Sequence, residues 1–359
     1  MAADTPMDRH GLIAGTFSKY ESDALPFINT RAMFETNRIY CRVQGVPFLE
    51  RPYLTIGKHL AAVVEFSEHY HVGTEDLKRW GVGFPHVMKA AIRNLAKRPL
   101  QLESPTPGLF VTCGDDVFTT STILLRDQIS RLAVKGDPII MLPHGMVVAG
   151  SEDLDALRGM VHVAETQLRE YWGTSGIALK MEEQGWSPWL PPQSHELYKD
   201  FRLFHLGSLA QDYLSQQNLC RSLYDKRGEW IKVIDYEVST GYLGSEDALF
   251  SHSCWHQEAA GALLPEVEVV AFPPKEGRWY RLVPWQQVVE VAGDLLEPED
   301  IFPPRWRIKG FPSDRQLAAM TDLPDTPYYE DGNALAIVCG AIHSRRYGPG
   351  WYKAQVYGG

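Results

Sequence analysis

The sequence predicts an α+β protein with two similar-sized domains, in which antiparallel or mixed sheets are flanked by helices. The chain has 359 residues, roughly twice the length of a typical domain. Short apolar runs that end at Gly, Pro or Asp alternate with segments whose apolar residues recur at helical spacing. Hydrophobic residues make up 44% and charged residues 22%, which are ordinary globular values. Disordered and low-complexity classes are therefore excluded.

The first half of the chain predicts an arm followed by an α+β domain. Residues 1–35 mix charges and aromatics without a clear period, so we expect an N-terminal arm there. The domain at 36–172 should contain, in order, a strand at 37–46, helices at 56–70, from Thr74 and at 85–95, a strand at 108–113, a helix at 122–134, a hairpin of 138–142 with 146–149, and a helix that Ser151 caps.

A linker is predicted at residues 173–193. Glycines and prolines recur there and interrupt any regular pattern of backbone pairing. The same segment contains Trp186 and Trp189, large side chains that favour burial. We therefore expect this linker to pack against a domain.

The second α+β domain is expected at residues 194–359, with a C-terminal aromatic extension. Its pattern predicts a helix at 196–219, strands at 230–238 and 249–256, a hairpin of 267–272 with 279–283, and a helix from Pro284. The apolar run at 139–143 is similar to that at 269–273, 130 residues later, and a strand and a helix follow each. Either the domain is duplicated, or a common motif recurs by chance.

Charge and cysteine usage narrow the choice of compartment and partner. Lys plus Arg number 35 and Asp plus Glu 45, giving a net charge of −10. Such a chain complements a basic protein better than a polyphosphate, so we expect a protein partner of basic character and no nucleic acid. The longest apolar run, nine residues at 334–342, is far shorter than the roughly 20 that span a membrane, so no membrane is expected. Five scattered cysteines without a CxxC pair, and no signal peptide at residues 1–20, predict a cytoplasmic protein.

Part of the first half resembles a known family. The segments at 88–95, 119–125 and 138–143, with the helix that follows, resemble the YtpQ-like family of bacterial proteins over about residues 80–170. Ser253-Cys254-Trp255 and the run at 263–265 look similar to segments of related bacterial proteins. The family's apolar strand continues with a charged pair, which is absent here, where Pro143 is followed by His-Gly-Met. The resemblance implies an α+β fold and a cytoplasmic bacterial protein, and it supplies no catalytic residues.

The main candidate polar site is His252, Cys254, His256 and Glu258. Residues two apart on a strand share a face, so these side chains should line one side. Imidazole and thiolate are ligands that Zn²⁺ prefers. One flat strand rarely supplies three ligands, because alternate side chains lie about 7 Å apart. The alternative is a strand with a polar, wetter face and Trp255 in the core.

Two further clusters are secondary candidates. Glu65 and His69 are four residues apart, so on a helix they would meet, with Glu68 and His71 nearby. This pattern fits a carboxylate-oriented histidine or a solvated helix end. Cys113 precedes Asp115 and Asp116, so it is either a nucleophile or a half-buried thiol in a turn. The neighbouring carboxylates would raise the pKa of this thiol, which disfavours the nucleophile.

Aromatic residues in loop-like segments are candidates for contact with a partner. Tyr and Trp are enriched at interface hot spots, but they also attach loops to a core. The candidates are Trp186, Trp189, Trp306, Tyr328, Tyr329 and Trp351. Arginines interleave with aromatics around Arg305 and Arg345, a pattern that can bind single strands of nucleic acid, although the acidic chain favours a structural or protein-contact role.

The sequence contains no recognised catalytic or nucleotide-binding motif in a credible context. The leading hypothesis is a non-enzymatic cytoplasmic protein that binds another protein, in an immunity-type or regulatory role. The alternative is an enzyme with an unfamiliar, metal-dependent site around His252, Cys254 and His256. No cofactor is predicted; zinc is the metal that the alternative would require.

Overall fold

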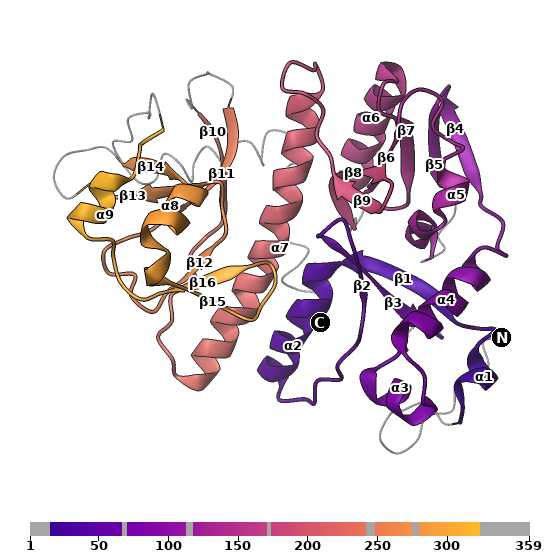
Figure 1. Cartoon of the computed structure of the whole chain (residues 1–359), viewed down its shortest axis with the longest axis horizontal. Helices are drawn as coiled ribbons and strands as arrows, with labels where there is room; N and C mark the ends of the chain where they lie inside the picture. The colour runs from indigo at the N-terminus through magenta and orange to yellow at the C-terminus, as the bar shows by residue number, and fades with distance from the viewer. Residues whose placement is uncertain are drawn as a thin grey trace. The chain divides into compact units, whose positions relative to one another are not determined.

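The computed structural model describes residues 15–66, 70–112, 118–170, 174–241, 248–274 and 280–323. The chain forms two compact units (Figure 1). Unit 1 comprises residues 1–34 and 47–201, and unit 2 comprises residues 35–46 and 202–359. Both units combine helices with antiparallel or mixed sheets, so the predicted α+β class is confirmed.

A six-stranded antiparallel sheet forms the larger part of unit 1. The helix α6 (Leu154–Glu170) packs against it and buries Leu157 and Met160. Residues 139–142 are all buried, which explains why this strand is a continuous apolar run. In sheet order the strands are β4 (Leu102–Thr106), β5 (Leu109–Thr112), β7 (Val147–Gly150), β6 (Pro138–Leu142), β8 (Ser175–Glu182) and β9 (Gly185–Pro188).

A second, three-stranded antiparallel sheet completes unit 1. Its order is β1 (Leu25–Thr30), β3 (Leu60–Glu65) and β2 (Leu54–Ile56). The helix α4 packs on this sheet, and its buried residues include Val87 and Ala91. Besides α6, unit 1 contains α1 (Phe17–Tyr20), α3 (Thr74–Trp80), α4 (Phe84–Leu95), the 3₁₀ helix Thr119–Leu124 and α5 (Arg126–Ile129).

Unit 2 contains two small sheets. The four-stranded sheet has the order β10 (Glu237–Gly241), β11 (Ala248–Cys254), β13 (Val269–Phe272) and β14 (Arg281–Pro284), with β11 and β13 parallel and the other pairs antiparallel. The three-stranded antiparallel sheet has the order β12 (Leu263–Pro265), β16 (Arg305–Ile308) and β15 (Leu296–Pro298). Its helices are α2 (Arg31–Gln44), α7 (Tyr198–Arg227), α8 (Trp285–Ala292), the 3₁₀ helix Gly293–Leu295 and α9 (Asp314–Ala319). The first four residues of α2 and of α7 belong to unit 1.

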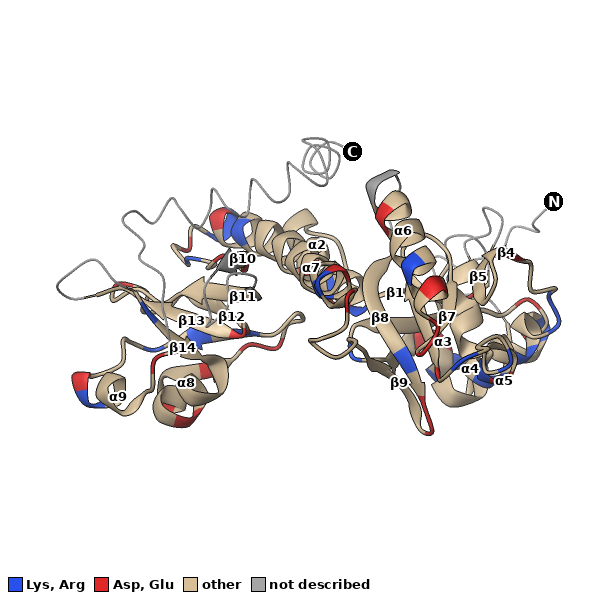
Figure 2. Cartoon of the chain, turned by 90° about the horizontal axis from the view of Figure 1, so that it is seen from above, with Lys and Arg blue, Asp and Glu red and all other residues tan. Residues whose placement is uncertain are grey.

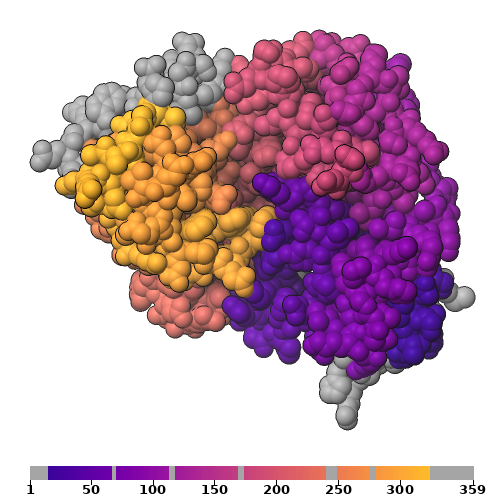
Figure 3. Space-filling view, in the orientation of Figure 1, coloured from indigo at the N-terminus to yellow at the C-terminus, as the bar shows by residue number. Residues whose placement is uncertain are grey.

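The two faces of the four-stranded sheet of unit 2 have different environments. One face packs under α8 and contributes Trp255, Val270, Phe272 and Val283 to a large apolar cluster of the unit. The other face carries Phe250 and a second, smaller cluster. This alternation follows from the period of two along each strand. Figure 3 shows the orange-to-yellow surface that the later segments of unit 2 form.

Two predicted elements have the wrong type. Residues predicted as a strand at 37–46 belong to the helix α2 (Arg31–Gln44). Ile39 and Val43, one helical turn apart, pack there with Leu223 of α7, a contact that local β propensity does not reveal. The helix predicted at 56–70 is wrong as well, because its apolar residues form β2 and the fully buried β3. A short apolar run does not by itself distinguish a buried strand from a helix.

The segment predicted as a linker is part of a domain. Residues 175–182 and 185–188 form the hairpin of β8 and β9, and β8 also pairs with β6. Gly185 and Pro188 lie on the edge strand β9, and Gly176 lies where the register between β8 and β6 shifts, positions at which glycine and proline are tolerated. The boundary between the units instead crosses α7 after Phe201, so the predicted linker at 173–193 is wrong.

The proposed duplication is not confirmed. The hairpins β6–β7 and β13–β14 are each followed by a helix, as the sequence pattern indicates. Their sheet neighbours differ, because β6 pairs antiparallel with β8 whereas β13 pairs parallel with β11.

The predicted N-terminal arm at 1–35 is wrong in its described part, because residues 25–30 form β1 and pair with β3. The helix predicted at 122–134 is a 3₁₀ helix followed by the short α5. The predicted cap of α6 is wrong as well, since the helix begins at Leu154 and the Ser151 hydroxyl accepts from the Asp137 amide instead.

Most other elements follow the prediction in type. The helix at 85–95, the strand at 108–113 and the strand at 249–256 agree with α4, β5 and β11 within a few residues. The predicted strand at 230–238 is an exception, since pairing as a strand begins only at Glu237 and Val233 makes a single bridge to Leu263. Within the described ranges, no helix is both long and apolar enough to cross a membrane.

Candidate functional site

A cavity of about 200 Å³ opens on the face of the four-stranded sheet of unit 2 that α8 does not cover. Four of its polar lining residues are Glu237, His252, Cys254 and His256. Three of these four are the histidines and the cysteine of the main sequence-predicted site. We call this cavity the unit 2 pocket.

The local fold explains why these side chains share the pocket. Phe250, His252 and Cys254 alternate along β11 and point to one face, as predicted, while Trp255 belongs to the core on the other side. Glu237 of β10 lies directly opposite His252 in the antiparallel register. Directly opposite residues of an antiparallel pair lie on the same face, so this register brings the carboxylate to the imidazole.

His252 is the central residue of the pocket. Its side chain is 1% exposed, and neither ring nitrogen has a hydrogen-bond partner among the described residues. Nε2 lies 3.4 Å from Oε2 of Glu237. Burial lowers the pKa of His252 to about 4, so the imidazole is neutral at pH 7. A neutral imidazole carries one N–H donor and one acceptor nitrogen, and both need partners when buried.

The other acidic groups of the pocket are also shifted towards their neutral forms. Burial, followed by the charge of Glu237, raises the pKa of the Cys254 thiol to about 12. Burial and the nearby Asp235 raise the pKa of Glu237 itself. Cys254 is therefore a thiol and a poor nucleophile at neutral pH.

The edge of the pocket is more polar and wetter. His256 is half-buried, and burial together with Lys232 lowers its pKa. Glu258, which the sequence grouped with these residues, is exposed and does not line the pocket. The strand ends at Cys254 and the chain then turns, so the alternation that would have brought Glu258 to this face stops.

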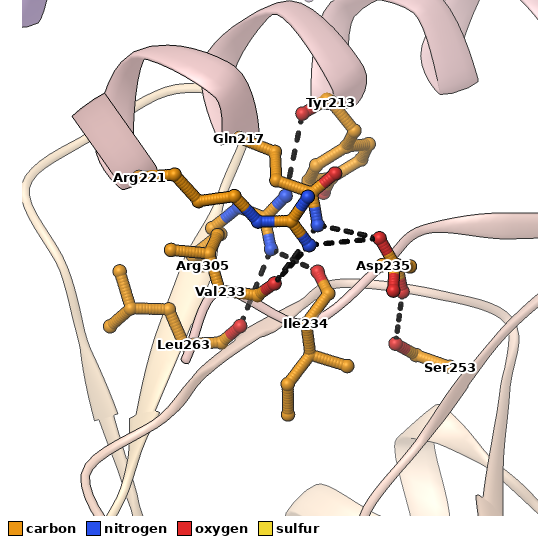
Figure 4. A network of polar contacts seen from close by, with 9 residues as sticks. All are labelled: Tyr213, Gln217, Arg221, Val233, Ile234, Asp235, Ser253, Leu263 and Arg305. Atoms are coloured by element: carbon orange, nitrogen blue, oxygen red, sulfur yellow. Dashed lines mark hydrogen bonds and ion pairs between the residues drawn. The ribbon is translucent and has the colours of Figure 1, made fainter. Parts of the chain in front are cut away.

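A buried arginine fixes the segment that forms one wall of the pocket (Figure 4). Arg305 of β16 is 1% exposed and donates from Nη1 to the Ile234 carbonyl (2.6 Å) and from Nε to the Gln216 side chain (2.6 Å). Its guanidinium also lies over the Tyr213 ring, 5.4 Å from the centroid. Asp235, which follows Ile234 in the chain, is also fixed in position, because its backbone carbonyl accepts a hydrogen bond of 2.5 Å from the Ser253 hydroxyl.

The same network partly neutralises the carboxylate of Asp235. Oδ1 accepts from Gln217 at 2.7 Å and from Arg221 at 3.2 Å (Figure 4). Asp235 and Ile234 both line the pocket. The network therefore fixes the position of this wall. Of the two pocket carboxylates, Asp235 contacts an arginine, whereas Glu237 contacts none in the described part of unit 2.

Among the described residues, no group of three or more His, Cys, Asp or Glu side chains is placed to hold a metal ion. His252 and Cys254 lie on β11, whereas His256 lies two residues beyond the end of this strand. We therefore derive no zinc chemistry from them.

The secondary candidates do not form a second site in the part of the chain that the structure describes. Glu65 is buried at the end of β3 and forms a β-bridge with His71, whose ring lies 5.2 Å from that of Phe27. The helical pairing predicted for Glu65 is wrong, because this residue is in a strand. Glu68, His69, Cys113, Asp115 and Asp116 lie outside the described residues.

The aromatic candidates that the structure describes pack within their own units. Trp186 donates from Nε1 to the Ile123 carbonyl at 3.2 Å. Trp189 packs edge-on against Phe201, with centroids 5.2 Å apart, and Trp306 joins the core cluster of unit 2. These contacts support the structural alternative for all three. The other candidates, Tyr328, Tyr329 and Trp351, with Arg345, lie outside the described residues.

Sequence reasoning missed several residues of the pocket. Glu237, Asp235 and Lys232 lie before β11 in the chain, and Tyr280 lies beside β14. The turn-rich residues at 241–247 indicate a hairpin that would place 237 opposite 252, so Glu237 could have been found. No local pattern indicates Tyr280, which reaches the site through the pairing of β13 with β14.

Comparison of the chain with protein-family models, with curated proteins and with solved structures finds no match. The resemblance to the YtpQ-like family therefore stays a prediction.

Proposed function

We propose that this chain is a non-enzymatic binding protein, of immunity or regulatory type, and that the unit 2 pocket is its recognition site. The observation that supports this proposal is His252. A side chain that is 1% exposed lines a cavity while both its ring nitrogens lack a partner among the described residues. Leaving a buried polar group unpaired costs about 1–3 kcal/mol. A ligand that supplies the missing hydrogen bonds would recover that energy.

The protonation states favour binding over catalysis. An imidazole whose pKa is about 4 is a weak base at neutral pH, and a thiol whose pKa is about 12 is a weak nucleophile. Ligand binding requires neither a strong base nor a strong nucleophile, since a neutral His252 already offers a hydrogen-bond donor and an acceptor.

The size of the pocket limits the ligand to a small group. A cavity of about 150 Å³ is enough to hold a benzene-sized molecule, and sites for drug-sized ligands begin at about 300 Å³. At about 200 Å³, the unit 2 pocket suits a single side chain or a small metabolite.

An enzymatic function is the second candidate, and one observation favours it. Glu237 lies 3.4 Å from Nε2 of His252, an arrangement that resembles a carboxylate orienting a general base. Substrate binding would have to raise the pKa of His252 for this base to act at neutral pH. Turnover of a bound compound would therefore replace the binding proposal.

The same proposal includes a cytoplasmic place of action. Cys41, Cys220 and Cys254 are free thiols in the described part of the chain, a state typical of reducing compartments. The bacterial, YtpQ-like relationship belongs to this proposal too, and its support is the sequence pattern alone.

Saturation-transfer NMR with four probes, n-butylamine, propan-1-ol, acetamide and acetate, tests the pocket directly. We expect at least one probe to bind the full chain and to be recovered unchanged after prolonged incubation. The variant His252→Phe should lose this binding, and Ala271→Leu, which narrows the pocket from another strand, should lose it as well. His162→Phe, a substitution of an exposed histidine in unit 1, is the matched control. Binding by none of the probes, or binding that both pocket variants retain, would refute the proposal.

A further inference from the structure

We propose that the unit 2 pocket receives the ammonium group of a lysine side chain presented by a basic protein partner. This inference rests on the proposed function and specifies its ligand. It follows from the acceptors of the pocket, from its charge and from the nature of its walls.

The polar groups at the centre of the pocket are acceptors. Nε2 of His252 faces the Glu237 carboxylate at 3.4 Å, which favours the tautomer with hydrogen on Nε2. Nδ1 is then a buried acceptor that has no donor among the described residues. The Glu237 carboxylate can accept further hydrogen bonds. An ammonium group has three donors and no acceptor, so it complements the free acceptor positions of this carboxylate.

The pocket lining contains two carboxylates and one ammonium group. Two carboxylates, of Glu237 and Asp235, and one ammonium, of Lys232, act on the Cys254 thiol, and the effect of Glu237 exceeds that of Lys232. Lys232 is exposed and also acts on His256 at the pocket edge. Because Asp235 is already paired with Arg221, Glu237 is the carboxylate that most needs a cation.

The walls of the pocket suit the aliphatic part of a lysine. Phe250, Ala271 and Leu282 line it from three neighbouring strands, and Tyr280 adds a second aromatic ring. Methylene groups pack against such surfaces, and an ammonium near an aromatic face gains a cation–π attraction. The compact, threefold donor of lysine fits separate point acceptors better than the planar fork of arginine, which prefers a bidentate carboxylate.

The chain as a whole favours a basic protein as the source of this lysine. The net charge of −10 attracts positively charged partners and speeds their encounter. In Figure 2, acidic and basic residues both occur on helices such as α6 and α9, so the attraction itself would have little directional specificity. A pocket for one side chain supplies that specificity.

Isothermal titration calorimetry of the full chain with two peptides tests the inference. The probes are acetyl-Gly-Lys-Gly-amide and the uncharged analogue in which norleucine replaces lysine. We expect the lysine peptide to bind at least tenfold more tightly. Glu237→Gln should reduce its affinity at least tenfold, because the isosteric amide retains the shape and removes the charge. Glu258→Gln, which removes an exposed carboxylate outside the pocket lining, should leave the affinity unchanged.

The outcomes separate this inference from the proposed function. Equal binding of both peptides, or no effect of Glu237→Gln, would overturn the lysine assignment. Binding of free n-butylamine without binding of the lysine peptide would assign the pocket to a small amine and not to a protein. Binding of propan-1-ol or acetamide alone would leave the recognition site standing and refute its cationic ligand. If no probe binds, both proposals fail.

Discussion

Replacing Trp255 with alanine should destabilise unit 2 strongly. The side chain is 0% exposed and lies 5.7 Å from the Phe272 ring, on the sheet face that packs under α8. Loss of a buried Trp or Phe to alanine costs about 3–5 kcal/mol. Because β11 is paired on both sides, the surrounding backbone can collapse only partly into the cavity. We therefore expect a loss within that range.

Differential scanning calorimetry of the full chain measures this effect. For a unit of this size, each kcal/mol lowers the melting temperature by about 2–4 °C, so the transition of unit 2 should fall by roughly 6–20 °C. Trp255→Phe should cost much less, because it retains a ring and removes an indole N–H that is buried without a described partner. Trp230→Ala, at a fully exposed position, is the control. A shift for Trp255→Ala no larger than that of the control would refute the assignment of the two sheet faces.

Three further predictions concern the network, the backbone and pH. Arg305→Met should destabilise unit 2 by about 2–5 kcal/mol in denaturant unfolding, because two buried acceptors lose their donor. The control Arg307→Met breaks a half-exposed ion pair and should cost less than about 1 kcal/mol. Equal losses of stability in the two variants would contradict the structural role of the Arg305 network. Gly150→Ala should destabilise unit 1, because the added Cβ would overlap a backbone carbonyl oxygen. Gly207→Ala, at an open position on α7, should stabilise the helix by up to about 1 kcal/mol. Thermal melts in which Gly150→Ala is the more stable variant would contradict the surroundings of the two glycines. The pKa of His252 is lowered in the fold to about 4, so its contribution to stability is complete above pH 6.5 and is lost as the pH falls towards 4. Over this interval, His252→Asn should lose less stability than the unsubstituted chain. Parallel curves of unfolding free energy against pH for the two proteins would contradict the burial of a neutral imidazole.

Period-two alternation predicted the pocket face of β11 correctly. Phe250, His252 and Cys254 line the pocket and Trp255 lies in the core, because alternation is a property of the strand itself. The same pattern was misleading at Glu258, where the strand has already ended. Alternation identifies a face and not the residue at which pairing stops.

The parts of the site that depend on long-range pairing were not predictable in the same way. Arg305 is separated by 71 residues from the Ile234 carbonyl that it holds, and its surroundings in the sequence favoured a structural or protein-contact role without indicating its partners. Its burial results from the packing of β16 beside β12 and α7, which no local pattern encodes. The helix at Ile39 and Val43 was missed for the same reason, since its partner residues on α7 lie about 180 residues later in the chain.

The most direct test of the proposed recognition site is ¹⁵N NMR of the His252 imidazole in the full chain, recorded during titration with acetyl-Gly-Lys-Gly-amide at pH 7. The free protein should show a neutral imidazole with hydrogen on Nε2, in keeping with a pKa of about 4 and with the 3.4 Å contact to Glu237. Binding should shift the Nε2 resonance, because the ammonium group changes the charge environment of the Glu237 carboxylate 3.4 Å away, while the resonances of the exposed His162 stay unchanged. A His252 resonance that stays constant throughout the titration, or that shows a protonated ring at pH 7, would contradict the account.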